Sequence, residues 1–230
     1  MSILEVSNLK KIYTTRFGAS QVQALSNISF SVEEGEYVAI MGESGSGKTT
    51  LLNILAALDQ PTDGEVILNG KKLQSVREKE IAAFRRKHLG FVFQDFNLLD
   101  NFNLRDNIYL PLVLSDTKYA EMEARLEPLA KKLGISQLLD KFPYEVSGGQ
   151  KQRVAVARAL ITRPELILAD EPTGNLDSES SKEIMDIIQS LWKQGNTIVL
   201  ITHDINVANQ AARKVYVHDG MLTDEARRKL

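Results

Sequence analysis

Cysteine is absent from the 230-residue sequence, which excludes disulfide scaffolds, thiolate metal sites and cysteine nucleophiles. Positive and negative charges are nearly balanced, with 28 Lys and Arg residues and 30 Asp and Glu residues. The resulting net charge of −2 argues against a protein that binds nucleic acid by bulk phosphate attraction. Long hydrophobic runs are also missing, because no stretch approaches the roughly 18 apolar residues of a spanning helix. We expect any work at a membrane to be done from outside the lipid.

Short apolar segments alternate with helical patterns along much of the chain. Residues 28–33 alternate apolar and polar side chains, as a half-buried strand does, and residues 37–41 form the continuous apolar run of a buried parallel strand. These patterns predict one α/β domain over residues 1–230, with a mainly parallel sheet, a β-rich N-terminal part and a helical subdomain inserted at about 95–160. The expected strands are 28–33, 37–41, 65–68, 166–169, 197–201 and 215–217, and the expected helices are 48–57, 78–87, 119–133, 150–160 and 181–192.

Residues 42–49 fit the phosphate-loop pattern G-x-x-x-x-G-K-[ST] and lie between a predicted strand and a predicted helix. Glycines allow successive backbone N–H groups to point at phosphate oxygens, and the helix N-terminus adds its dipole. Lys48 would hold the β- and γ-phosphates, and the Thr49 hydroxyl would bind Mg²⁺. The sequence therefore predicts a nucleoside triphosphate site. Its expected contacts are Gly42, Ser44, Gly45, Ser46, Gly47, Lys48, Thr49 and Thr50.

Asp170 and Glu171 follow the apolar run 166–169, where ligands bind in open α/β sheets. Such a pair often only caps a helix or lies in a solvated turn. Its occurrence together with a phosphate loop favours a metal-binding and catalytic role for the two carboxylates. Asp170 then belongs to the Mg²⁺ shell, and Glu171 orients or deprotonates the attacking water. No guanine-reading N-K-x-D motif occurs. Tyr13 either offers its ring to adenine or packs as an ordinary strand residue.

Residues 146–160 read Val-Ser-Gly-Gly-Gln followed by a predicted helix. Ser147 is a good N-cap residue, and the two glycines open the backbone at a second helix N-terminus suited to anions. This stretch resembles the signature motif of ATP-binding cassette (ABC) ATPases. The resemblance implies a RecA-like core, an antiparallel β subdomain and a helical subdomain. It also implies that four residues contact nucleotide: Ser147, Gly148, Gly149 and Gln150.

The other motifs of this family follow in order. Gln94 resembles the Q-loop glutamine, which contacts magnesium and the attacking water. Residues 174–177 resemble the D-loop, and the resemblance implies that Asp177 also contacts nucleotide. His203 resembles the switch histidine that contacts the γ-phosphate, and Tyr13 matches the aromatic residue that stacks on adenine. The resemblance thus implies that Glu171, His203, Gln94 and Lys48 are catalytic, and that Thr49, Gln94 and Asp170 bind the metal.

The family resemblance also implies a mechanism and partners. Two copies would form a head-to-tail homodimer, with each ATP between one copy's phosphate loop and the other's signature motif. Hydrolysis would open the dimer and move a transmembrane permease subunit. The protein would then be peripheral, at the cytoplasmic face of the membrane, and would bind ATP and Mg²⁺ but no nucleic acid.

Several segments are similar to one group of cassettes, which serves lipoprotein release, macrolide efflux and antimicrobial-peptide resistance. The segments 91–99 and 170–177, and an insertion at 14–21, carry this likeness, and 94–112 most resembles the bacitracin-type ATPases. Glu43 stands where proline is frequent, and Val146 where leucine is frequent.

Three other functions remain open at this stage. The same group includes lipoprotein-releasing and macrolide-efflux ATPases. A soluble ABC ATPase acting on another macromolecule is a further alternative, as is a nucleotide-binding regulator without turnover. Between Lys48 and Ser147 the chain is too short for the coiled-coil insertions of chromosome-structuring cassettes, which favours the transporter subunit.

Overall fold

The computed structural model describes residues 1–14 and 21–227, with side chains through Thr223. The expected insertion at 14–21 therefore lies almost wholly outside the described residues. The chain divides into two compact units. The first unit comprises Met1–Ala82 and Gly195–Leu230, and the second unit comprises Ala83–Gln194.

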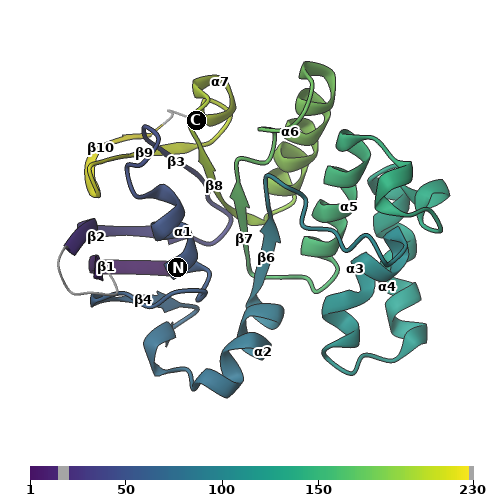
Figure 1. The fold of residues 1–230 in the computed structure, drawn as a ribbon, viewed down its shortest axis with the longest axis horizontal. Coiled ribbons are helices and arrows are strands. Elements are labelled where there is room, and N and C mark those ends of the chain that lie inside the picture. Colours follow the sequence, from purple (N-terminus) through teal and green to yellow (C-terminus); the bar gives the residue numbers. More distant parts are fainter. Residues whose placement is uncertain (15–20, 228–230) are drawn as a thin grey trace. The chain divides into compact units, whose positions relative to one another are not determined.

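The first unit contains an antiparallel sheet in the order β2-β1-β4-β5, whose long strands lie side by side in Figure 1. Alternate side chains of β1 and β2, such as Leu4, Val6, Ile28 and Val32, are buried, as the period of two predicts. The strands are β1 (Ser2–Thr14), β2 (Gln21–Glu33), β4 (Asp63–Leu68) and β5 (Lys71–Lys72).

A second sheet of the first unit holds four strands in the order β10-β9-β3-β8. The strand β3 is parallel to both β8 and β9, while β10 is antiparallel to β9. Every residue of β3 and β8 is buried, which explains the continuous apolar runs 37–41 and 198–201. The elements are β3 (Tyr37–Met41), β8 (Thr197–Thr202), β9 (Arg213–His218), β10 (Met221–Arg227), α1 (Lys48–Leu55), the 3₁₀ turn Leu73–Ser75 and α7 (Ile205–Ala208).

The second unit combines two parallel strands, β6 and β7, with four helices. Gly90 in β6 lies against α5, and a Cβ there would lie 2.6 Å from the carbonyl oxygen of Ala159. The helix α2 (Glu78–His88) crosses the boundary between the units. The other elements are β6 (Leu89–Val92), α3 (Leu104–Val113), α4 (Tyr119–Lys132), α5 (Gly148–Leu160), β7 (Leu166–Asp170), α6 (Ser178–Lys193) and the 3₁₀ turns Ser136–Leu138 and Pro143–Glu145.

All the expected strands and helices are present. Most ends differ by up to three residues, but β2 begins at Gln21, seven residues before the expected strand 28–33. Besides the 3₁₀ turns, the elements that were not individually expected are β1 in the part expected only to be β-rich, β5, β6 inside a stretch interpreted as helical, α3 with a proline at position 111, α7, and β10 after β9. The inserted subdomain at about 95–160 stays a prediction. Within residues 1–14 and 21–227, none of the helices has the length and apolarity to cross a bilayer.

Candidate functional site: a phosphate loop and a set of catalytic segments

The phosphate loop connects β3 to α1 in the first unit and depends on glycine at two positions. A Cβ on Gly42 would lie 2.1 Å from the carbonyl oxygen of Val217, so no other residue fits against β9 there. Gly47, at the N-cap of α1, has a φ of 103°, which favours glycine. These two constraints bend the chain back on itself directly before the helix.

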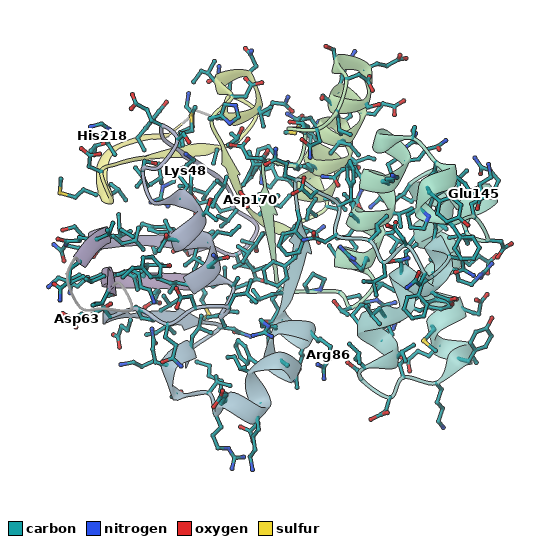
Figure 2. All side chains as sticks on the ribbon, viewed as in Figure 1. Lys48, Asp63, Arg86, Glu145, Asp170 and His218 are labelled. Carbon is teal, nitrogen blue, oxygen red and sulfur yellow. The ribbon has the colours of Figure 1, made fainter. Side chains whose placement is uncertain are left out.

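Lys48 occupies the inside of this bend. Its side chain is 8% exposed, and its Nζ donates to the carbonyl oxygens of Gly42 and Glu43, both at 2.7 Å. Figure 2 shows Lys48 at the start of α1. The hydroxyl of Ser46 is buried and has no hydrogen-bond partner among the described residues. A glycine-containing loop with a fixed ammonium and an unused hydroxyl is suited to an anionic ligand.

The first turn of α1 carries the two threonines expected to contact nucleotide and metal. Thr49 is exposed and Thr50 is half-buried. The described residues of this turn include no acid, so the positive end of the helix dipole is not neutralised locally. This end of α1 can therefore attract a phosphate.

Tyr13 lies near the end of β1, 41% exposed. Its hydroxyl donates to Asp59 Oδ2 at 2.8 Å, and Lys11 Nζ lies 4.8 Å from its ring centroid. Partial burial and the Asp59 hydrogen bond raise the pKa of the Tyr13 hydroxyl. The contacts with Asp59 and Lys11 thus hold the Tyr13 side chain in place, while part of its ring stays accessible to a planar ligand.

His203 follows β8 and is exposed at the first-unit loop before α7. The loop is fixed on both sides of the histidine. Thr202 Oγ1 accepts from the Asp204 backbone N–H at 3.0 Å, and the Asp204 side chain caps α7 through Asn206. The position of His203 is therefore defined by the backbone around it.

In the second unit, Asp170 ends β7 and Glu171 begins the next turn (Figure 2 labels Asp170). Glu171 has a φ of 43°, which is uncommon for a residue with a side chain. Its carbonyl oxygen accepts from the backbone N–H of Gly174 at 2.9 Å. The backbone of the turn is therefore fixed directly after the strand, and the separate metal-binding and water-activating roles of Asp170 and Glu171 stay predictions.

Gln94 follows β6 and is bound to the D-loop segment by Asn175. Gln94 Nε2 donates to Asn175 Oδ1 at 3.3 Å, while Asn175 Nδ2 donates to the Gln94 carbonyl at 3.2 Å and to Asp95 Oδ1 at 2.7 Å. The donor end of the Gln94 amide is therefore engaged, and its oxygen is the end left to accept or to bind a cation.

The signature stretch begins α5 with a complete capping box. Ser147 Oγ accepts from the Gln150 N–H at 3.3 Å, and Gln150 Oε1 accepts from the Ser147 N–H at 3.0 Å, so the expected N-cap is confirmed. A Cβ on Gly149 would lie 2.6 Å from Ser180 Oγ on α6. Gly149 is thus required by helix packing, while Gly148 is half-buried.

Asp177 also caps a helix. Its Oδ1 accepts from the N–H groups of Glu179 and Ser180 at 3.1 and 2.9 Å, at the start of α6. The hydrogen bonds with Ser180 lower the pKa of the Asp177 carboxyl. The described contacts give Asp177 this capping role; its nucleotide contact stays a prediction.

Two residues of α5 were missed by the sequence analysis. Gln152 is fully buried, and Arg158 donates to the carbonyl oxygens of Phe96 and Asn97, the latter two both at positive φ. The available signal was their polarity within a helix that otherwise contributes small apolar residues such as Ala155. Each side chain satisfies backbone carbonyls outside its own helix.

The residues expected to bind Mg²⁺ supply oxygen donors of the right chemistry: the Thr49 hydroxyl in the first unit, and the Gln94 amide and Asp170 carboxylate in the second. Among the described residues, no group of three or more His, Asp or Glu side chains gathers as a metal cage. A metal would need further oxygens from a nucleotide, as is usual for Mg²⁺ at phosphates. The donor set fits that arrangement.

Comparisons with known proteins identify the family of this chain. Residues 25–174 match the family described as ABC transporter. The chain is 44% identical to the bacitracin export ATP-binding protein BceA of Halalkalibacterium halodurans, over 96% of this chain and 87% of that protein. It is 43% identical to the macrolide export ATP-binding/permease protein MacB of Rhodopirellula baltica, over 99% of this chain and 33% of that protein.

Among solved structures, the chain is similar to the ATP-binding cassette MJ0796 in a dimeric post-hydrolysis state bound to ADP and Pi. The TM-score is 0.89 with 39% identity, over 99% of this chain and all of that one. The α/β cassette fold expected from the resemblance is therefore confirmed. The chain belongs to the ABC transporter family and is one of its ATP-binding, ATP-hydrolysing subunits.

Proposed function

We propose that this subunit drives the export or removal of antimicrobial peptides or similar amphiphilic compounds, as the peripheral ATPase of a transmembrane permease at the cytoplasmic face of the membrane. The single observation that supports ATP-driven work most directly is the Lys48 ammonium held inside the phosphate loop beside the unused Ser46 hydroxyl. The peptide cargo is supported by the 44% identity to a bacitracin export ATPase.

The proposed reaction is hydrolysis of ATP. Lys48 would exchange its two loop carbonyls for phosphate oxygens, and Tyr13 would stack on adenine. Glu171 would accept the proton of the attacking water, and His203 would donate to the γ-phosphate. Mg²⁺, when bound by Thr49, Gln94 and Asp170, would neutralise phosphate charge.

We further propose that two copies close on ATP, with the Ser147–Gln150 capping box of one copy against the γ-phosphate in the other. Supporting this, the N-terminus of α5 presents backbone N–H groups that an anion can accept from, and the similar cassette MJ0796 is dimeric in its post-hydrolysis state. Release of phosphate would remove the shared anion and separate the copies.

The variant Glu171→Gln tests this proposal. It removes the base but keeps the shape of the side chain, so we expect ATP to bind normally, hydrolysis to fall about 1,000-fold, and a dimer to accumulate. Size-exclusion chromatography with and without ATP measures the dimer. A monomer with ATP at saturating concentration, or unchanged turnover, contradicts the proposal.

A macrolide or lipoprotein cargo is the second candidate, because the identity to a macrolide export protein is 43%. Purifying the subunit from its native membrane, identifying the multi-span protein bound to it, and measuring ATPase stimulation by bacitracin, erythromycin and a lipopeptide would decide between them. Stimulation by the macrolide alone would replace the peptide assignment.

A further inference from the structure

The helix α5 carries a buried polar side chain that no assigned role uses. Gln152 is 0% exposed. Its Nε2 donates two hydrogen bonds, to the carbonyl oxygen of Phe93 at 3.2 Å and to that of Pro172 at 2.6 Å. Its Oε1 is buried and has no partner among the described residues. One amide group therefore joins two backbone segments that are far apart in sequence.

Both segments carry residues of the proposed reaction. Phe93 directly precedes Gln94, and Pro172 directly follows Glu171. Because each carbonyl is one peptide unit from a candidate catalytic residue, the Gln152 amide fixes how far apart the two backbones lie. The same helix begins at the signature stretch, only five residues before Gln152, so α5 connects all three motifs.

A second connection joins these two segments from the exposed side. Asn175 holds Gln94 and Asp95 through its side-chain amide. A Cβ on the neighbouring Gly174 would lie 2.9 Å from Gln94 Nε2, so glycine there leaves room for the Gln94 side chain. The two segments are thus connected by the buried Gln152 side chain and by the exposed Asn175 side chain.

A purely structural role for Gln152 would satisfy two carbonyls and nothing more. Two features favour a functional role. A buried amide with an unsatisfied oxygen is a costly way to fill a core position. Glu171 adopts an uncommon positive φ, and such a conformation persists where the surrounding structure holds it.

We propose that Gln152 is a positioning residue for ATP hydrolysis. Its amide hydrogen bonds set the spacing between the Gln94 segment and the Glu171 segment, and the hydrogen bonds of Asn175 stabilise the same arrangement. The inference rests on the proposed roles of Gln94 and Glu171. It deepens that proposal by naming the side chain that sets their spacing.

The variant Gln152→Glu tests this positioning role, because it keeps the shape of the side chain but removes both hydrogen-bond donors at neutral pH. We expect kcat for ATP to fall 10- to 100-fold, since a displacement of about 1 Å at reacting groups has effects of that size. The KM for ATP should stay within about twofold, because the phosphate loop is not touched. Amide hydrogen exchange of the nucleotide-free protein should rise at residues 93–97 and 171–175 and not at the phosphate loop.

A second variant keeps the test decisive if Gln152→Glu does not fold. Asn175→Ala removes only exposed hydrogen bonds, so we expect a three- to tenfold loss of kcat with the same pattern of hydrogen exchange. Two matched controls make the same chemical changes at exposed positions of the second unit: Gln137→Glu and Asn101→Ala. Both should behave as wild type.

The outcomes separate this inference from the proposed function. A wild-type protein that does not hydrolyse ATP overturns the proposed function itself. If wild type hydrolyses ATP but both variants keep kcat within twofold, or lose kcat and ATP affinity together with a general rise in hydrogen exchange, the positioning role is overturned. A selective loss of kcat with local exchange at the two segments supports it.

Discussion

The phosphate loop and the catalytic segments reach defined geometries by different means. In the phosphate loop the side-chain hydrogen bonds are local, because Lys48 donates to carbonyls five and six residues away, although Gly42 also packs against Val217 of β9. The Gln94 and Glu171 segments are instead held by side chains from distant positions, above all Gln152 and Asn175. The Lys48 hydrogen bonds depend on nearby residues, whereas the positions of the Gln94 and Glu171 segments depend on side chains that are distant in sequence.

The largest expected effect comes from a substitution in the phosphate loop. Lys48→Ala removes the only loop ammonium that can form charge-assisted hydrogen bonds to phosphate, at roughly 1.5–3 kcal/mol each. We expect ATP affinity to fall about 100-fold, with the fold retained because the two carbonyls that lose the Lys48 donor belong to the half-buried Gly42 and the exposed Glu43. Isothermal titration calorimetry measures the affinity, and Lys182→Ala, an exposed change, is the control. Equal affinities for wild type and Lys48→Ala would refute the phosphate-loop assignment.

Arg158→Gln tests whether the Gln94 segment depends on side chains that are distant in sequence. The Arg158 guanidinium holds the carbonyls of Phe96 and Asn97, both in left-handed conformations, and glutamine is too short to reach both. We expect kcat to fall about 10-fold through a displaced Gln94 segment, while ATP affinity changes little. Steady-state kinetics with ATP titration separates the two quantities. A loss of affinity as large as the loss of kcat would mean that the two regions are not independent.

Tyr13→Ala sharpens the comparison on the first-unit side. The ring should add about 1 kcal/mol of stacking on adenine, so ATP affinity should weaken about fivefold. Inorganic triphosphate, which has no base, should bind wild type and variant equally and serves as an internal control. If triphosphate binding weakens as much as ATP binding, the ring acts on the loop and not on adenine.

The smallest expected effect concerns pH. The pKa of Asp177 is lowered in the folded protein by its hydrogen bonds with Ser180, so its ionised form stabilises the fold above the unfolded pKa of about 3.9. That contribution is lost as the pH falls through the folded value. Asp177→Asn keeps a good cap but removes the charge, so the two melting temperatures should differ at pH 7 and converge as acidification protonates the folded Asp177. A constant difference during this acidification contradicts the assignment.

The contrast between the regions also explains what the sequence could predict. The strands 37–41 and 197–201, the Lys48 loop and the Ser147 cap depend on neighbours in sequence, and each could be identified from local pattern. The strand β6 was missed because its four residues, Leu89–Val92, lie within a helical stretch. The roles of Gln152 and Arg158 depend on carbonyls about 20 to 60 positions away, which no local pattern encodes.

The contacts of Lys48 in the nucleotide-free protein have a consequence for how quickly the loop can fill. Its ammonium is already desolvated and oriented by two carbonyls, so an arriving triphosphate exchanges acceptors on a pre-arranged side chain. The entropy of ordering a long, flexible lysine is then lost during folding and not during capture. Nucleotide entry should therefore be fast, and the slow events of the cycle should be those that move whole segments.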